Sequence, residues 1–246
     1  MRKIIYNEEK AIIDEGIYFG CGVFETIYWG DKPLFLDEHL DRLSESVEKL
    51  NMEELEIDKI LEFFDTLNIK NKAVKITVTP CNIIISQRDI PYDDSCYNKG
   101  VTLCTSNVCR NSTSIMAYIK STCYYENIIE KEKVVEKGYN DALFFNEKGS
   151  LTETSCANIF IVRNDMIFTP RISDGLLDGI IRRWIIKNFN VIEKTLTYKE
   201  LEECDEVFIS NSLMGVMSVS KIDEISYSDR KVCNIIRNSY EKLRQN

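Results

Sequence analysis

The stretch Leu151-Thr152-Glu153-Thr154-Ser155-Cys156-Ala157-Asn158 is the most informative part of this chain, because two other features stand in a fixed order around it. Lys120 precedes it, and Gly179-Ile180-Ile181-Arg182 follows it at the start of a predicted helix. The chain therefore presents an amine, then the carboxylate of Glu153, then a run of backbone N–H groups where a helix begins.

These three features match the needs of an aldehyde cofactor that carries a phosphate. Such a cofactor needs one lysine amine for a Schiff base, an acidic residue that keeps its ring nitrogen protonated, and N–H groups that hold its phosphate. Lys120, Glu153 and the pair Ile180-Ile181 are one candidate for each part, which predicts a pyridoxal 5′-phosphate site. The ordinary alternatives are a surface lysine, an exposed hairpin carboxylate and two core isoleucines.

The composition is typical of a globular protein that stays inside the cell. The chain has 246 residues, of which 44% are hydrophobic, and this length is enough to bury a sizeable core. Its formal net charge is −9 and no basic stripe interrupts that balance, so we expect no nucleic acid as a partner. No apolar run approaches membrane-spanning length, so we expect no membrane either. The N-terminus turns acidic before any apolar run long enough for a signal peptide, so the predicted location is the cytoplasm.

The cysteine and histidine counts exclude several kinds of site. Nine cysteines occur without a C-x-x-C pair, and we expect them to be small buried hydrophobic residues in a reducing compartment. His39 is the single histidine, which excludes zinc sites built on several histidines, and no metal is predicted. The glycine-rich phosphate loops of nucleotide-binding proteins are also missing from the sequence.

Hydrophobic periodicity predicts two α/β halves. In the first half we expect strands at 2–6, 23–29, 34–36, 73–79, 83–86 and 101–105, and helices at 37–50, capped by Asp37, and 53–67. In the second half we expect strands at 141–145, 156–162, 166–168, 207–210 and 215–219, and helices at 122–137, at 179–189 and at the C-terminus. The polar stretch after residue 106 is the best linker candidate. The expected division is a smaller N-terminal α/β domain over 1–106, a linker over 107–116 and a larger cofactor-binding domain over 117–246.

With these motifs in place, the chain resembles the class IV aminotransferases, the fold type IV group of pyridoxal phosphate enzymes. The resemblance covers nearly the whole chain and rests on these motifs in order: Asp14-Glu15-Gly16, Gly20-Cys21-Gly22-Val23-Phe24-Glu25-Thr26, His39-Leu40-Asp41-Arg42-Leu43, Lys120, Glu153, Asn158 and Gly179-Ile180-Ile181-Arg182. It implies an α/β (α+β) architecture of two α/β domains joined by a short linker, with the cofactor between them. It also implies a homodimer that acts on a small-molecule substrate.

The resemblance assigns roles to residues that spacing alone leaves open. Lys120 is the implied catalytic residue. Arg42 is implied to bind the cofactor phosphate, although a helix-surface ion pair with Glu38 or Glu45 is the alternative. Asn158 is implied to support the site from beneath. The remaining implied cofactor contacts are the backbone at Ile180 and Ile181 and the side chains of Asn211 and Ser212, for which a simple turn is the alternative.

Departures from the family pattern favour one branch of it. Aminotransferases of this group often carry threonine where this chain has Ile181, and an arginine and histidine that bind a substrate carboxylate do not follow Val78-Thr79 here, although Arg88 is near. The segment Asn211–Met217 resembles that of the aminodeoxychorismate lyases, and its methionines suggest a pocket for a flat ring. The resemblance thus implies 4-amino-4-deoxychorismate lyase activity, which forms 4-aminobenzoate and pyruvate for folate synthesis. A branched-chain or D-amino acid aminotransferase, or a non-catalytic binding protein of the same fold, are the alternatives.

Overall fold

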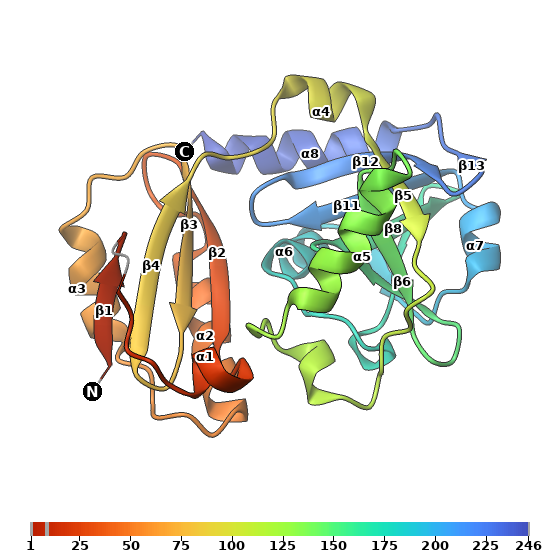
Figure 1. Ribbon diagram of the computed structural model, residues 1–246. Coiled ribbons are helices and arrows are strands. Elements are labelled where there is room, and N and C mark those ends of the chain that lie inside the picture. The colour runs from red at the N-terminus through yellow and green to blue at the C-terminus, as the bar shows by residue number, and fades with distance from the viewer. Residues whose placement is uncertain (1, 8–9, 246) are drawn as a thin grey trace. The chain divides into compact units, whose positions relative to one another are not determined.

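The computed structural model describes residues 2–7 and 10–245 and divides into two compact units (Figure 1). Unit 1 comprises Met1–Pro91 with Ile119–Tyr124, and unit 2 comprises Tyr92–Tyr118 with Tyr125–Asn246. This division differs from the expected boundaries at 106 and 117. Residues 101–105 pair with strands of unit 2, and residues 119–124 return to unit 1, so the chain passes between the units more than once.

Unit 1 is built on a four-stranded sheet in the order β1-β4-β3-β2. Its strands are β1 (Lys3–Tyr6), β2 (Val23–Trp29), β3 (Lys72–Val78) and β4 (Asn82–Arg88), and its helices are α1 (Glu15–Phe19), α2 (Leu36–Lys49) and α3 (Ile57–Asp65). Side chains alternate between the two faces of each strand. One face carries Val23, Ile27 and Ile76, which form a core with Leu40 and Leu43 of α2. The other face carries Phe24 and its neighbours.

The start of α2 differs from the predicted one. Residues 34–36 were expected to form a strand and Asp37 to cap the helix, but Leu34 and Phe35 form a turn and α2 begins at Leu36. Phe35 is the residue before the helix, with a left-handed φ of 57°, and it makes no side-chain cap. The strand prediction is wrong because a short apolar run fits a turn between strand and helix as well as it fits a strand.

Unit 2 is built on a nine-stranded sheet. Its strands are β5 (Val101–Thr105), β6 (Asp141–Phe145), β7 (Leu151–Thr154), β8 (Asn158–Arg163), β9 (Met166–Thr169), β10 (Val191–Glu193), β11 (Glu206–Asn211), β12 (Gly215–Ile222) and β13 (Ile225–Ser226). Its helices are α4 (Asp94–Lys99), α5 (Tyr125–Glu136), α6 (Ile180–Asn188), α7 (Tyr198–Glu202) and α8 (Lys231–Arg244), with short 3-10 turns at Ile115–Tyr118 and Ile172–Asp174.

Six of these strands pair in a closed ring, β8-β11-β12-β5-β6-β7 and back to β8. Closure removes the free strand edges that would otherwise need protection. One edge of β8 is shared, because Asn158 pairs with Glu153 of β7 while Ile161–Arg163 pair with β9. In Figure 1, α5 and α8 lie along this sheet, and α8 packs on β11 and β12. The ring brings β7 and β8 together, and these strands carry the stretch from Leu151 to Asn158.

The exposure of the cysteines corrects one further expectation. All nine cysteines are free thiols, but Cys233 is the buried one, while Cys109 and Cys123 are exposed and the rest are half-buried. The expectation of uniformly buried cysteines is therefore wrong.

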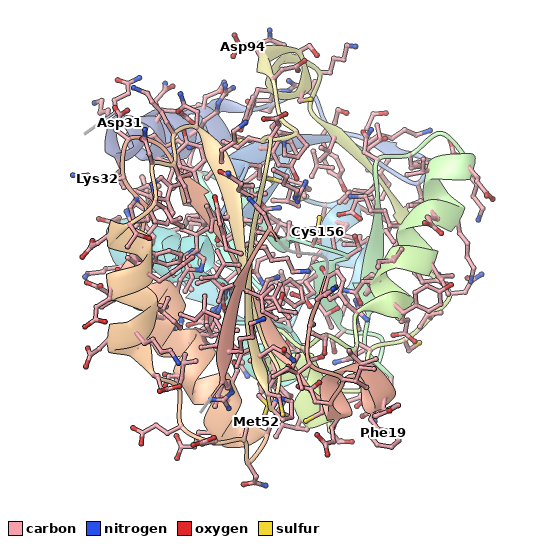
Figure 2. All side chains as sticks on the ribbon, turned by 60° about the vertical axis from the view of Figure 1, so that its left-hand side comes forward. Phe19, Asp31, Lys32, Met52, Asp94 and Cys156 are labelled. Atoms are coloured by element: carbon pink, nitrogen blue, oxygen red, sulfur yellow. The ribbon has the colours of Figure 1, made fainter. Side chains whose placement is uncertain are left out.

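Figure 2 shows Phe19 at the end of α1, where its side chain is 79% exposed. Within the described ranges, no helix has the length and apolar character needed to cross a membrane.

Candidate active site

Lys120 lies on a short segment that extends the sheet of unit 1 beside β2. The N–H of Phe24 donates to the carbonyl of Lys120 at 2.8 Å, and the N–H of Thr122 donates to the carbonyl of Gly22 at 2.8 Å. This antiparallel pairing sets Lys120 opposite Phe24, so both side chains lie on the same face. The Nζ of Lys120 is 4.6 Å from the centroid of the Phe24 ring, and the side chain is half-buried, as expected.

Arg42 is fixed by a carboxylate that the sequence analysis did not assign to it. Its Nε donates to Oε1 of Glu25 and its Nη2 donates to Oε2 of Glu25, both at 2.7 Å. Nδ1 of His39 is also 2.7 Å from Oε2 of Glu25. Glu25, His39 and Arg42 are 1%, 1% and 6% exposed. The alternative of a helix-surface ion pair is therefore wrong for Arg42, because its guanidinium is buried against a strand.

The charges of these three side chains explain their protonation. Burial by itself raises the pKa of Glu25, but the charges of Arg42 and His39 and their hydrogen bonds outweigh it, so the pKa lies well below its ordinary value of 4.5. Burial lowers the pKa of His39, and the nearby charges of Arg42 and Lys120 act in the same direction against the opposing effect of Glu25. We therefore assign His39 as neutral, with Nδ1–H donating to Glu25 and Nε2 without a hydrogen-bond partner among the described residues.

In unit 2, Glu153 is oriented by the two elements around it. Its Oε2 accepts from the N–H of Leu177 at 3.2 Å and from Nδ2 of Asn158 at 3.4 Å. Asn158 is buried and also donates to the carbonyl of Leu177 at 2.8 Å. Glu153 is half-buried, so the interpretation of an exposed hairpin carboxylate is wrong. Asn158 holds Glu153 from an adjacent strand, and its support of a cofactor stays a prediction.

The start of α6 leaves its first N–H groups without a side-chain cap, because Gly179 occupies the N-cap position. A Cβ at Gly179 would lie 2.0 Å from Oδ1 of Asn158, so only glycine fits there. Arg182 anchors this end of the helix through Asp178, Glu193 and the carbonyl of Pro170. The uncapped N–H groups can receive a phosphate, and the carboxylate of Glu153 can receive a protonated ring nitrogen. The donor set of unit 2 therefore fits pyridoxal 5′-phosphate.

Asn211 stabilises the turn between β11 and β12. Its Oδ1 accepts from the N–H groups of Leu213 at 3.0 Å and Met214 at 2.9 Å, and its Nδ2 donates to the carbonyl of Cys156 at 3.1 Å. The turn interpretation is thus confirmed for the Asn211 side chain, and Ser212 lies in the same turn. A contact of either residue with a phosphate stays a prediction.

The side chains of Met214 in this turn and Met217 on β12 are buried. Met214 and Met217 are 2% and 1% exposed and pack in the hydrophobic core of unit 2 with Leu103 and Ile159. The expectation that they shape a site for a flat ring is therefore wrong for their side chains. The alternation of side chains along β12 could have indicated this burial, because Met217 lies on the same face of the strand as the apolar Val219.

The predicted site residues thus fall into two groups, one in each unit. Lys120 and Arg42 belong to unit 1, while Glu153, Asn158, Ile180, Ile181, Asn211 and Ser212 belong to unit 2. Sequence reasoning missed the contribution of Glu25 and His39. Both stand in the quoted motifs, but nothing in their spacing shows that a strand carboxylate binds a helix arginine.

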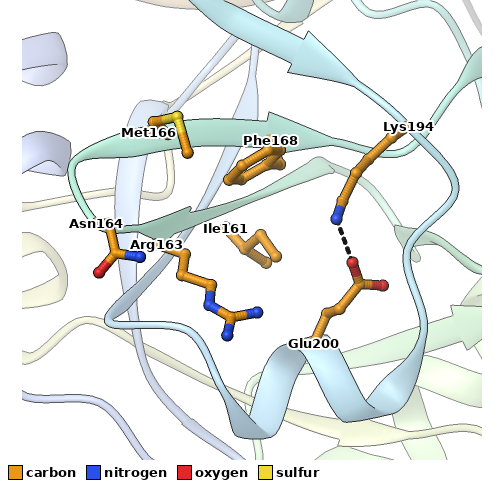
Figure 3. Close-up of a pocket in the computed structure, with 7 residues that line it drawn as sticks. All are labelled: Ile161, Arg163, Asn164, Met166, Phe168, Lys194 and Glu200. Carbon is orange, nitrogen blue, oxygen red and sulfur yellow. Dashed lines mark ion pairs between the residues drawn. The ribbon is translucent and has the colours of Figure 1, made fainter.

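Unit 2 also has a cavity of about 270 Å³ that contains none of the predicted residues (Figure 3). It is lined by Ile161, Arg163, Asn164, Met166, Phe168, Lys194 and Glu200. Ile161 and Asn158 are an odd number of positions apart on β8, so their side chains lie on opposite faces of the strand. Lys194 forms an ion pair with Glu200 across the cavity. These observations separate the cavity from the site around Glu153.

Comparison with known proteins identifies the family. Residues 22–222 match the amino-transferase class IV family, so the chain belongs to that family. It is an enzyme with the fold type IV architecture, and the enzymes of the family depend on pyridoxal 5′-phosphate.

Individual relatives carry different activities. The chain is 30% identical to the aminodeoxychorismate lyase of Bacillus subtilis, over 92% of this chain and 87% of the relative. It is 28% identical to a D-alanine aminotransferase of Staphylococcus epidermidis, over 94% of this chain and 91% of the relative. The structure of the branched-chain amino acid aminotransferase from Escherichia coli superposes with a TM-score of 0.85 at 20% identity, covering 95% of this chain and 88% of that one, which shows a shared fold alone. These identities do not separate lyase from aminotransferase.

Proposed function

We propose that the protein is a 4-amino-4-deoxychorismate lyase that releases pyruvate and forms 4-aminobenzoate. The observation that favours this reaction is the β3–β4 turn. Residues at this turn form hydrogen bonds with the side chain of Asp14. Its Oδ2 accepts from Oγ1 of Thr79 at 2.6 Å, from the N–H of Cys81 at 2.8 Å and from Nδ2 of Asn82 at 3.0 Å. These turn residues include neither the arginine nor the histidine with which aminotransferases of the family bind an amino acid carboxylate.

Six residues would contact the cofactor in this proposal, and Asn158 would position one of them. The N–H groups of Ile180 and Ile181 and the guanidinium of Arg42 would bind its phosphate, with Ser212 and Asn211 beside them. Glu153, held in place by Asn158, would keep the ring nitrogen protonated. Ile181 is 1% exposed, so its contribution would come from the backbone and not from the side chain.

When bound, pyridoxal 5′-phosphate would supply an electron sink for the carbon that bears the substrate amine. Lys120 would then remove the proton from that carbon as a general base. The anionic carboxylate of Glu153 favours this step because it stabilises positive charge at the ring nitrogen. Loss of pyruvate from the neighbouring carbon makes the remaining ring aromatic, which drives the reaction toward products.

An aminotransferase is the second candidate function, and the similarity to D-alanine aminotransferase supports it. The two reactions share their first proton removal and differ in the next step. A transaminase would release a keto acid, whereas the lyase would expel pyruvate and leave the amine on its aromatic product.

Product analysis separates the candidates. We expect purified holoenzyme with aminodeoxychorismate to form pyruvate and 4-aminobenzoate in equal amounts, without accumulating pyridoxamine phosphate. Lys120→Ala should abolish this turnover, because no other group is assigned to remove the proton. Multiple-turnover transamination of D-alanine or leucine with 2-oxoglutarate, without any 4-aminobenzoate from aminodeoxychorismate, would refute the lyase proposal and leave the family assignment standing.

A further inference from the structure

Register places three cationic side chains on one face of the unit 1 sheet. Lys75 of β3 pairs with Thr26 of β2 and Ser86 of β4, and Arg88 of β4 pairs with Ala73, two residues from Lys75. Residues two apart on a strand share a face, so Lys75 and Arg88 are diagonal neighbours on the face that carries Phe24 and Lys120.

The Phe24 ring connects these cations. The Nζ of Lys75 lies 4.2 Å from its centroid, and the Nζ of Lys120 lies 4.6 Å from the same centroid. The distance between the Nζ atoms of Lys75 and Lys120 therefore cannot exceed the sum of their two distances to the Phe24 centroid. A cation within about 6 Å of an aromatic centroid is attracted to the ring, so Phe24 holds both amines beside one another.

Lys75 and Arg88 lack the carboxylates that accompany their neighbours. Lys70 pairs with Asp31 at 2.7 Å and Lys72 pairs with Asp89 at 2.6 Å, but no described carboxylate forms an ion pair with Lys75 or Arg88. Desolvation and the charge of Arg88 lower the pKa of Lys75, although its side chain still reaches solvent. Lys75 and Arg88 repel each other, and a bound anion would relieve that repulsion.

We propose that Lys75 and Arg88 bind a carboxylate of the substrate and thereby orient the substrate toward Lys120. The proposal rests on the function proposed above, because it takes Lys120 as the residue that reacts. A carboxylate would neutralise both cations at once and could accept hydrogen bonds from each of them. Lys75 and Arg88 are thus assigned as binding residues, with no part in the proton transfer.

The position of these cations suits a dicarboxylate whose acid groups stand away from its amine. In an α-amino acid the carboxylate adjoins the carbon that bears the amine. In aminodeoxychorismate one carboxylate lies across the ring from the amine and the other lies on the side chain that becomes pyruvate. Lys75 shares the Phe24 ring with Lys120 and Arg88 lies one strand further along the sheet, so the pair can receive a carboxylate that is separated from the reacting carbon.

Binding of an unreactive analogue to the holoenzyme tests the assignment. Chorismate keeps both carboxylates but has a hydroxyl in place of the amine, so it binds without entering the reaction. We expect Lys75→Met and Arg88→Met each to weaken chorismate binding by about ten- to a hundredfold in calorimetric titration. Lys75→Arg should retain most of the affinity. In turnover assays Lys75→Met should raise KM with little change in kcat.

Lys72→Met is the matched control, because it removes the same charge from the same strand. Lys72 and Lys75 are an odd number of positions apart on β3, so their side chains lie on opposite faces of the sheet. The absorption spectrum of the bound cofactor should be the same in all variants. Equal losses in Lys75→Met and Lys72→Met, or no loss in either, would overturn the assignment.

A second probe distinguishes this inference from the lyase proposal. If wild-type protein does not bind chorismate but binds 2-oxoglutarate in a Lys75-dependent manner, the lyase proposal fails and the carboxylate site stands. If wild-type protein binds chorismate and forms 4-aminobenzoate while Lys75→Met and Arg88→Met bind it normally, the carboxylate site fails and the lyase proposal stands.

Discussion

At the scale of single residues, the group formed by Glu25, His39 and Arg42 shows how burial decides charge. One carboxylate accepts hydrogen bonds from two basic side chains in a place that excludes water. The guanidinium already balances the charge of Glu25, so an added proton on His39 would leave an unbalanced positive charge near Arg42 and Lys120. A neutral histidine is the result.

This protonation state predicts how stability depends on pH. The pKa of His39 lies below its ordinary value of 6.5, so the folded protein binds this proton more weakly than the unfolded chain does. The free energy of unfolding should therefore fall as the pH drops below 6.5, by at most about 1.4 kcal/mol per pH unit. The depressed pKa of Glu25 adds a further loss only below its ordinary value of 4.5.

Urea unfolding between pH 7.5 and 5 measures this slope. Since His39 is the single histidine of the chain, it is the only side chain whose ordinary pKa falls in this interval, and His39→Asn should flatten the dependence. Asparagine keeps an N–H donor near Glu25 but does not titrate. An unchanged slope in His39→Asn would contradict the assignment of a neutral buried histidine.

At the scale of secondary-structure elements, the end of one element constrains the interior of another. Gly179 at the start of α6 lies against Asn158 of β8, and Asn158 in turn holds Glu153 of β7. The geometry of a helix start and the orientation of a strand carboxylate are therefore coupled.

Gly179→Ala should weaken cofactor binding and destabilise the fold by about 1–3 kcal/mol, because the added methyl would overlap with Oδ1 of Asn158. Cofactor titration and thermal unfolding measure the two effects. In the Asn158→Ala background the same substitution should cost much less, since the obstructing atom is gone. Fully additive effects of the two substitutions would show that the contact is not the cause.

The pairing of the 119–124 segment with β2 gives Cys21 a defined neighbour. Val23 pairs with Ser121, the N–H of Thr122 donates to the carbonyl of Gly22, and Cys123 is the next residue after this pairing. The thiol of Cys123 lies 3.4 Å from the carbonyl of Gly20, and Cys123 is also one of the groups that raise the pKa of Cys21, after burial and nearby carboxylates.

Mild oxidation with diamide should therefore link Cys21 to Cys123. The linked peptide should appear by mass spectrometry after digestion without reducing agent, and Cys123→Ser should prevent it. Cys109 is also exposed and serves as the internal control for reactivity. Reaction of Cys109 with diamide without any link between Cys21 and Cys123 under the same conditions would contradict the expected proximity of these two cysteines.

At the scale of the whole molecule, unit 1 exposes an unusual number of large apolar side chains in one segment. They are Ile12, Ile13, Ile17, Tyr18 and Phe19. Contiguous exposed apolar surface often marks an interaction site. The segment leads directly into β2.

We predict that the protein is a homodimer in solution. Sedimentation at micromolar concentration should give about twice the mass of one chain, and Tyr18→Ser/Phe19→Ser should shift the equilibrium toward monomer because it removes apolar contact area. Lys3→Ser, a change on an exposed residue of β1, is the control. A monomeric mass for the unmodified protein would refute the prediction.

Local pattern by itself determined much of this structure. The strands at Val23–Trp29, Val101–Thr105 and Asp141–Phe145 occur with the predicted bounds, because the alternation and apolar content that define them lie within each segment. The order of Lys120, Glu153, Asn158 and Gly179-Ile180-Ile181-Arg182 was likewise enough to predict the family that the comparison then established.

Only the tertiary structure decided which distant segments meet. It placed Val101–Thr105 in the sheet of unit 2, joined Arg42 to Glu25, turned Met214 and Met217 into the core, and set Lys75 and Arg88 on the face of Lys120. The physical reason is that periodicity fixes the apolar side of one element, whereas strand register and the cost of burying charge depend on what the rest of the chain brings against it.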